Sequence, residues 1–120
     1  ACLDLSVSLH RAEGFGSTMA EAMLLGVPVV ATGYSGNLDF MRPENSCLVR
    51  WRETVVREAD GPFQPGTVWA EPDVEHAAEL CAWLSRDAAA RQRLTTIAAA
   101  DARRLLSVEA LAARLPALLA

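Results

Sequence analysis

Two glutamates stand on either side of a glycine pair near the start of the chain, in residues 10–23 (HRAEGFGSTMAEAM). Gly14 and Gly16 lack a Cβ, so the backbone there can approach a ligand closely. A helix that begins directly after such a turn offers unpaired N–H groups and roughly half a positive charge to an anion. The pattern therefore predicts a phosphate site, and Glu13 and Glu21 would repel a phosphate.

Both carboxylates are explained if the ligand carries hydroxyl groups as well as phosphates. An ionised carboxylate accepts two hydrogen bonds from the neighbouring hydroxyls of a diol. Glu13 precedes the turn, at the carboxyl end of a predicted strand, where open α/β sheets bind ligands. Glu21 lies about one helical turn inside the next helix and can face the same cleft. A nucleotide sugar, with a diol at each end and phosphates between them, fits this pattern.

The segments around this motif predict alternating strands and helices. Residues 3–9 (LDLSVSL) alternate between apolar and polar types, which is the period of a strand. Ser17 is expected to cap a helix that Gly26 ends. The β-branched residues 27–32 (VPVVAT) are expected to form a strand buried on both faces, as in parallel sheets. A loop then leads into one helical turn at 38–41.

Patterns in the second half change from strand-like to helical. Residues 47–56 alternate and are expected to form one strand, and residues 57–70, rich in Gly, Pro and charge, to form a surface loop. Residues 71–120 are expected to be helical, with apolar positions recurring along one face of the first helix. Three side chains are predicted to cap these helices: Asp73, Asp87 and Ser107.

Together these elements predict an α/β fold, a partial Rossmann-like parallel sheet followed by C-terminal helices. The strands are too few for a complete sheet, and the chain begins without Met. We therefore expect residues 1–120 to be a single fragment of a nucleotide-sugar-binding domain. Its parts are a strand–helix–strand core over 1–56, the loop over 57–70 and the helices over 71–120.

Composition excludes several classes of function. The net charge of −4 and the pI near 5.1 argue against a nucleic-acid partner, because phosphate backbones favour clustered basic surface. All eleven basic residues are Arg, so no residue of this chain forms a lysine Schiff base, including one with pyridoxal phosphate. The longest apolar run is too short to span a bilayer, and we expect no secretory leader.

The chain has three cysteines, Cys2, Cys47 and Cys81. They are odd in number and widely spaced, with no CxxC motif and no His pair at metal-ligand spacing. We therefore expect partly buried thiols in a reducing cytoplasm, rather than a disulfide framework or a zinc site.

The spacing of seven residues between Glu13 and Glu21, within EGFGSTMAEAMLLGVPVVAT, resembles the E-x7-E segment of retaining family 4 glycosyltransferases of GT-B fold. The preceding SLHRAEGFG and the downstream TGYSGNLDFM are similar to bacterial members that assemble polysaccharides. The resemblance covers residues 1 to about 106. It departs from the family at Ser17-Thr18-Met19, where aliphatic residues are more usual.

By position, the resemblance implies that Glu13 contacts the donor sugar hydroxyls and stabilises the sugar during transfer, as the catalytic residue. It implies that Glu21 binds the ribose diol. It also implies transfer with retention, by same-face attack as the pyrophosphate leaves, with no cofactor and no metal at the site. The groups implied to hold the sugar and pyrophosphate are the backbone amides of Gly14, Phe15, Gly16, Ser17 and Thr18.

The resemblance further implies partners beyond the donor. A glycan or lipid-linked acceptor would bind an N-terminal domain upstream of Ala1, and earlier basic residues would neutralise the pyrophosphate, with Arg11 adding one charge. The chain would be the second half of the GT-B C-terminal domain and inactive alone. The intact protein is expected in the cytoplasm, either free or peripheral at the inner membrane face. The unpaired sheet edge would allow the isolated chain to self-associate.

Two other hypotheses remain open at this stage. GFGSTMA begins like the G-x-G-x-x-G motif of dinucleotide-binding domains, but Met19 stands at the third glycine position and no acidic residue ends the 27–32 strand. The second hypothesis is a non-catalytic module whose Ala-rich helices bind a partner.

Single residues also have structural interpretations. Under these interpretations Glu21 is an exposed helix residue with no ligand. The charge of Glu13 only interacts favourably with the positive end of the helix dipole, and His10 is a structural histidine rather than a catalytic base. Trp83 is expected in the core rather than against a sugar. For Asn37 and Asp39, contact with the donor and capping of the short helix are equally compatible with the sequence.

Overall fold

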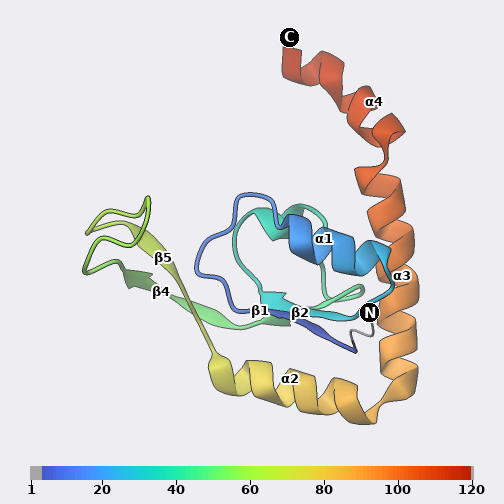
Figure 1. The fold of residues 1–120 in the computed structure, drawn as a ribbon, viewed down its shortest axis with the longest axis horizontal. Helices are drawn as coiled ribbons and strands as arrows, with labels where there is room; N and C mark the ends of the chain where they lie inside the picture. The colour runs from blue at the N-terminus through green and yellow to red at the C-terminus, as the bar shows by residue number, and fades with distance from the viewer. Residues whose placement is uncertain (1–3, 120) are drawn as a thin grey trace.

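A three-stranded parallel sheet forms the centre of the molecule in a computed structural model, which describes residues 4–119 (Figure 1). The strands are β1 (Ser6–Ser8), β2 (Val29–Thr32) and β3 (Cys47–Val49), in that order across the sheet. All four residues of the central strand β2 are buried, as the β-branched pattern predicts. The parallel sheet with helices after it confirms the predicted α/β fold.

A separate antiparallel hairpin follows β3. It consists of β4 (Trp51–Val55) and β5 (Val68–Pro72) and extends to one side of the molecule in Figure 1. The prediction of one strand over 47–56 is therefore wrong, because the chain leaves the parallel sheet at Arg50. Three of the residues predicted as loop, Val68, Trp69 and Ala70, already belong to β5.

Arg50 separates the two sheets because its backbone is bonded to the start of the following helix. The Arg50 N–H donates to Nδ1 of His76 at 3.0 Å, and its carbonyl accepts from the Asp73 N–H at 2.8 Å. A backbone engaged in this way cannot continue the ladder of β3. Alternation of side chains persists through the break, so the sequence pattern does not reveal it.

Helices cover both faces of the parallel sheet (Figure 1). Helix α1 (Ser17–Leu24) packs on one face, where Met19 and Met23 contact a cluster that includes Ala98 and Ala102 of α3 (Ala88–Leu106). Helix α2 (Val74–Arg86) packs on the other face. Its cluster comprises Val30, Cys47, Val49, Ala77 and Leu84.

The three predicted helix caps are confirmed. Asp73 Oδ1 accepts from the His76 N–H at 2.9 Å, and Asp87 Oδ1 accepts from the Ala90 N–H at 2.8 Å. Ser107 Oγ accepts from the Ala110 N–H at 3.0 Å. Each cap satisfies an N–H group that has no partner inside its own helix.

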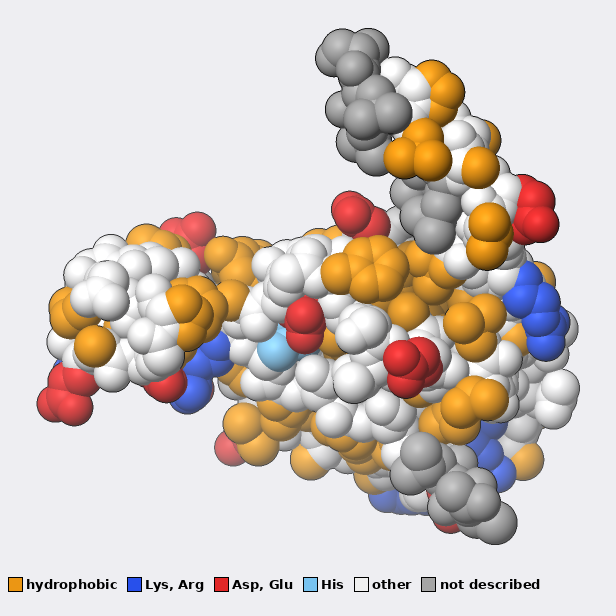
Figure 2. All heavy atoms as spheres, turned by 45° about the horizontal axis from the view of Figure 1, so that its top comes forward, with side chains coloured by type: hydrophobic (Ala, Val, Ile, Leu, Met, Phe, Trp, Pro, Cys, Tyr) orange, Lys and Arg blue, Asp and Glu red, His pale blue; other side chains and the backbone are white. Residues whose placement is uncertain are grey.

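Two features lie outside the packed body. Helix α4 (Val108–Leu119) extends away from the sheet, and Figure 2 shows hydrophobic side chains on its surface. Trp83 is 42% exposed on α2, so the prediction that it lies in the core is wrong. Its helix turns Ala77 and Leu84 toward the sheet and leaves Trp83 beside that face.

Within residues 4–119, no helix is both long and apolar enough to cross a bilayer.

Asp101 on α3 is a buried carboxylate that ties α3 to the loop after the short 3-10 helix η1 (Gly36–Asp39). It accepts from Nε and Nη2 of Arg42 at 3.1 and 2.7 Å, from Nδ2 of Asn45 at 3.0 Å and from Arg104 at 3.4 Å. The hydrogen bonds from Arg42 above all, and those from Asn45 and Arg104, hold the pKa of Asp101 below its usual value. The carboxylate therefore stays charged although it is only 8% exposed.

The two cysteines in the described part of the chain differ in their surroundings, whereas Cys2 lies outside it. Cys47 is buried in the sheet, and burial, with a smaller effect of nearby Cys81, raises its pKa to about 11. At pH 8 only about one thousandth of such a thiol is ionised. We expect iodoacetamide to label Cys81 first and Cys47 only after unfolding, measured by peptide mass mapping. Labelling of Cys47 in the folded protein at the rate of Cys81 would contradict its burial.

Candidate functional site

The turn before α1 follows the carboxyl end of β1. Gly16 is the N-cap residue of α1 and has a φ of 91°, which favours glycine. A Cβ on Gly16 would stand 2.8 Å from Cε of Met19 and 3.2 Å from Cβ of Asn37. The prediction that Ser17 caps α1 is therefore wrong. Ser17 is the first helical residue, because only Gly16 fits the left-handed position that precedes the helix.

The amino end of α1 has no side-chain cap. Gly16 has no side chain to offer, and no other side chain in residues 4–119 takes the cap position. The N–H groups of Ser17 and Thr18 consequently face no acceptor from their own helix, and both residues are exposed. This end of α1 is electrically positive and open to an anion.

Phe15, between the two glycines, points its ring at a neighbouring loop. The ring lies 5.2 Å from that of Phe40, and Phe15 remains 46% exposed. Its side chain therefore holds the turn in place from one side. The predicted contact of Phe15 with the ligand is made by its backbone N–H and not by its ring.

Glu13 is half-buried at the start of the turn. Its backbone carbonyl accepts two hydrogen bonds, from Oγ of Ser35 at 2.7 Å and from the Gly36 N–H at 3.1 Å. Within residues 4–119, its carboxylate makes neither an ion pair nor a hydrogen bond. The backbone of Glu13 is thus fixed, and its charge is available.

Glu21 lies in the second turn of α1 on its exposed side, between the buried residues Ala20 and Ala22. Among the described residues, no side chain bonds to its carboxylate. An exposed, unpaired glutamate of this kind fits both the ribose-binding hypothesis and the interpretation as an exposed helix residue.

The loop over residues 33–36 follows β2 and lies against the turn of Glu13. The Gly33 N–H donates to Val49 O at 3.0 Å, and the Trp51 indole N–H donates to Gly33 O at 2.7 Å. The ring of Trp51 also packs on Tyr34, with centroids 4.6 Å apart. The loops after all three parallel strands are therefore joined at one edge of the sheet.

His10 links the same two loops. Its Nε2 is 2.8 Å from the Tyr34 carbonyl oxygen, and its Nδ1 is 3.2 Å from Oγ of Ser8. Because a carbonyl can only accept, Nε2 carries a proton. Both ring nitrogens are thus engaged in the fold, which favours the structural interpretation of His10.

Of the two residues left open, Asn37 is fully buried and Asp39 is exposed. Nδ2 of Asn37 donates to Thr32 O at 3.1 Å, which holds the short 3-10 helix η1 (Gly36–Asp39) against the end of β2. Asn37 therefore positions the loop, with no surface of its own for a ligand. The sequence places η1 two residues too late.

Arg11 is paired with the hairpin. Its Nε and Nη2 donate to the carboxylate of Glu71 at 2.9 and 3.2 Å, and its guanidinium lies 5.2 Å from the ring centre of Trp69. The hydrogen bonds from Arg11 are the largest cause that lowers the pKa of Glu71. The positive charge of Arg11 is thus already matched by the carboxylate of Glu71, 60 residues away in the sequence. No local sequence pattern indicates this pairing.

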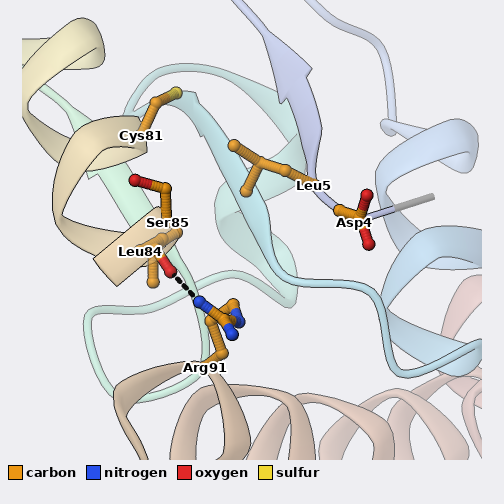
Figure 3. A pocket seen from close by; sticks show the side chains of 6 residues that line it. All are labelled: Asp4, Leu5, Cys81, Leu84, Ser85 and Arg91. Carbon is orange, nitrogen blue, oxygen red and sulfur yellow. Dashed lines mark hydrogen bonds between the residues drawn. The ribbon is translucent and has the colours of Figure 1, made fainter. Parts of the chain in front are cut away.

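A cavity of about 270 Å³ lies apart from these loops (Figure 3). Asp4 and Leu5 line it from the β1 side, and Cys81, Leu84 and Ser85 line it from α2. Arg91 reaches in from α3 and donates a hydrogen bond to the Leu84 carbonyl.

In the described part of the chain no group of three or more His, Cys, Asp and Glu residues could hold a metal ion.

Comparison with protein-family models matches residues 2–101 to the family described as glycosyl transferases group 1. The match includes the Glu13 turn, α1, the 33–36 loop and the Asp101 carboxylate. No curated protein matches the chain.

Proposed function

This chain belongs to the glycosyl transferases group 1 family, and we propose that it is the donor-binding part of a retaining enzyme of family 4 and GT-B fold. The observation that carries the proposal is the turn between Glu13 and α1. There an unpaired carboxylate stands directly before the uncapped, electrically positive start of a helix.

Each proposed role follows from the chemistry of its group. The carboxylate of Glu13 accepts hydrogen bonds from the donor sugar and stabilises the positive charge that develops on it. The amides of Gly14, Phe15 and Gly16, followed by those of Ser17 and Thr18, hold the sugar and the pyrophosphate. Glu21, one turn into α1, accepts from the two ribose hydroxyls.

In the proposed reaction an acceptor hydroxyl attacks the sugar carbon on the face from which the pyrophosphate departs. The bond between the sugar and the phosphate breaks as the new glycosidic bond forms, and the proton of the acceptor hydroxyl passes to the departing phosphate oxygen. The nucleoside diphosphate leaves, and the configuration of the sugar carbon is retained. Negative charge accumulates on the leaving pyrophosphate, beside the start of α1. The fixed N–H groups there stabilise that charge without reorganising. The proposal needs no metal.

The remaining parts of the proposal concern the intact protein. The chain would be one fragment, the second half of a donor domain, with a glycan or lipid-linked acceptor bound by a domain upstream of Ala1. Because Arg11 is paired with Glu71, other basic residues would neutralise the pyrophosphate. The product would be a bacterial polysaccharide made at the cytoplasmic side of the inner membrane. The edge strand β1, with Val7 half exposed, would favour self-association of the isolated chain.

Replacing Glu21 by alanine is expected to weaken nucleotide-sugar binding at least tenfold. A hydrogen bond to a charged group contributes about 1.5–3 kcal/mol, and the ribose would lose two. Ligand-observed NMR titration of UDP-, GDP- and ADP-sugars into the chain measures this and identifies the preferred nucleotide.

Glu79→Ala is the matched control, because Glu79 is an exposed carboxylate on α2, away from the turn. It should bind like the unaltered chain. Unchanged binding by the Glu21 variant, or no binding of any of these donors by the unaltered chain, would contradict the proposal.

A further inference from the structure

We propose that Ser35 is a positioning residue for Glu13, and that it sets affinity for the sugar part of the donor but not for the nucleotide part. The identity of the ligand, a nucleotide sugar, rests on the proposed function. The positioning role of Ser35 rests on the geometry of the 33–36 loop.

The first observation is the pair of hydrogen bonds on the Glu13 carbonyl. Oγ of Ser35 donates at 2.7 Å, and the N–H of Gly36 donates at 3.1 Å to the same oxygen. Two donors on one oxygen fix its direction. Because the peptide between Glu13 and Gly14 is trans, the Gly14 N–H then points the opposite way, away from the 33–36 loop.

The second observation is the backbone conformation of Ser35 itself. It has a φ of 80° and a ψ of −153°, a combination that favours glycine, and it is the one non-glycine residue with positive φ among those described. A serine held there at a conformational cost indicates that its hydroxyl is needed. Glycine would relieve the strain and would lose the bond to Glu13.

The third observation is how closely the two loops approach. An added Cβ on Gly36 would stand 1.9 Å from the carbonyl oxygen of Gly14. The loop is also held from behind, because His10 bonds to Tyr34 O and Trp51 bonds to Gly33 O. Ser35 therefore links the backbone of Glu13 to a loop that is itself held in place by His10 and Trp51.

Ser35→Ala and Ser35→Gly together test this role. Both remove the hydroxyl, but the glycine variant also removes the strain, so it should be at least as stable as the unaltered chain. The measurement is the dissociation constant, by isothermal titration, for the preferred nucleotide sugar and for the matching nucleoside diphosphate. The ratio of the two constants is the gain in affinity due to the sugar.

We expect this gain to fall about fivefold or more in both variants, with nucleoside diphosphate affinity within about twofold of the unaltered chain. Ser85→Ala is the matched control, because its hydroxyl makes a similar bond, 2.8 Å to the Ala82 carbonyl, on α2. It should leave both constants unchanged.

The outcomes separate the two proposals. An unaltered sugar gain in the stable glycine variant would overturn the positioning role while the proposed function stands. Equal loss of sugar-nucleotide and nucleoside diphosphate affinity would also overturn it, because that result indicates a general disturbance of the fold. Failure of the unaltered chain to bind any of these nucleotides would overturn the proposed function, and the ligand role of Ser35 with it.

Discussion

Replacing Gly36 by alanine is expected to remove detectable nucleotide-sugar binding from the chain. The added Cβ would stand 1.9 Å from the carbonyl oxygen of Gly14 and 2.5 Å from its carbonyl carbon. Ordinary C···O contacts begin near about 3.3 Å, so the two loops would have to separate by more than about 1 Å. Both hydrogen bonds to the Glu13 carbonyl would break. Displacing the Glu13 turn by that distance would break its hydrogen bonds to the donor, and each bond to a charged group contributes about 1.5–3 kcal/mol.

Isothermal titration with the preferred nucleotide sugar measures this loss, and circular dichroism checks that the variant is folded. Gly33→Ala is the matched control from the same loop. Its Cβ would meet Leu48 and Val49 at 3.4 Å, close to ordinary contact. We expect that variant to bind within a few-fold of the unaltered chain. Normal binding by the Gly36 variant would show that the close approach of the loops is not required.

Replacing Asp101 by alanine is expected to lower the free energy of unfolding by roughly 2–4 kcal/mol. The substitution leaves the buried amide of Asn45 without one of its acceptors, and it leaves Arg42 with only its 3.4 Å ion pair to Glu44. The loop that Arg42 begins would then lose its attachment to α3. Urea unfolding followed by circular dichroism measures the change, with Glu79→Ala as an exposed control expected to shift stability by less than about 0.5 kcal/mol.

The same carboxylate makes stability depend on pH. Its pKa is lower in the folded chain than in the unfolded chain, so its contribution is present above the unfolded value near about 4. That contribution is lost as the pH falls through the lower, folded value. The unaltered chain should therefore lose more stability below about pH 4 than the Asp101→Ala variant. Parallel acid titrations of the two would contradict the assignment.

Features that depend on local chemistry could be predicted from the sequence. The β-branched residues of β2 lie buried between helices, and Asp73, Asp87 and Ser107 cap their helices, because each signal involves a residue and its near neighbours. Glycines at 14 and 16 likewise indicated a turn before a helix. The roles of Glu13 and Glu21 stay predictions.

Features that depend on partners distant in the sequence could not be predicted. Ser17 looked like a helix cap, but the packing of Met19 and Asn37 around the turn requires glycine at the cap position. The pairing of Arg11 with Glu71 joins residues 60 positions apart. Ser35 stands in a stretch that indicated a loop and contributed to the family resemblance, but gave no role to Ser35 itself. Its significance comes from a backbone oxygen 22 residues earlier, and backbone atoms leave no trace in residue type.

The closure at the base of the β4–β5 hairpin makes this segment modular. Arg50 and Asp73 are bonded through their backbones and also form an ion pair at 3.2 Å, so the chain leaves and re-enters the body at one point. Trp51 and Glu71, near the base, bond to Gly33 and Arg11, so the part that can change without moving β3 or α2 is the outer end of the hairpin, between Val55 and Val68. Near this base Glu71 forms an ion pair with Arg11, which lies in the segment that leads to Glu13. Diversification of the hairpin would then alter what borders the site while the site itself keeps its frame.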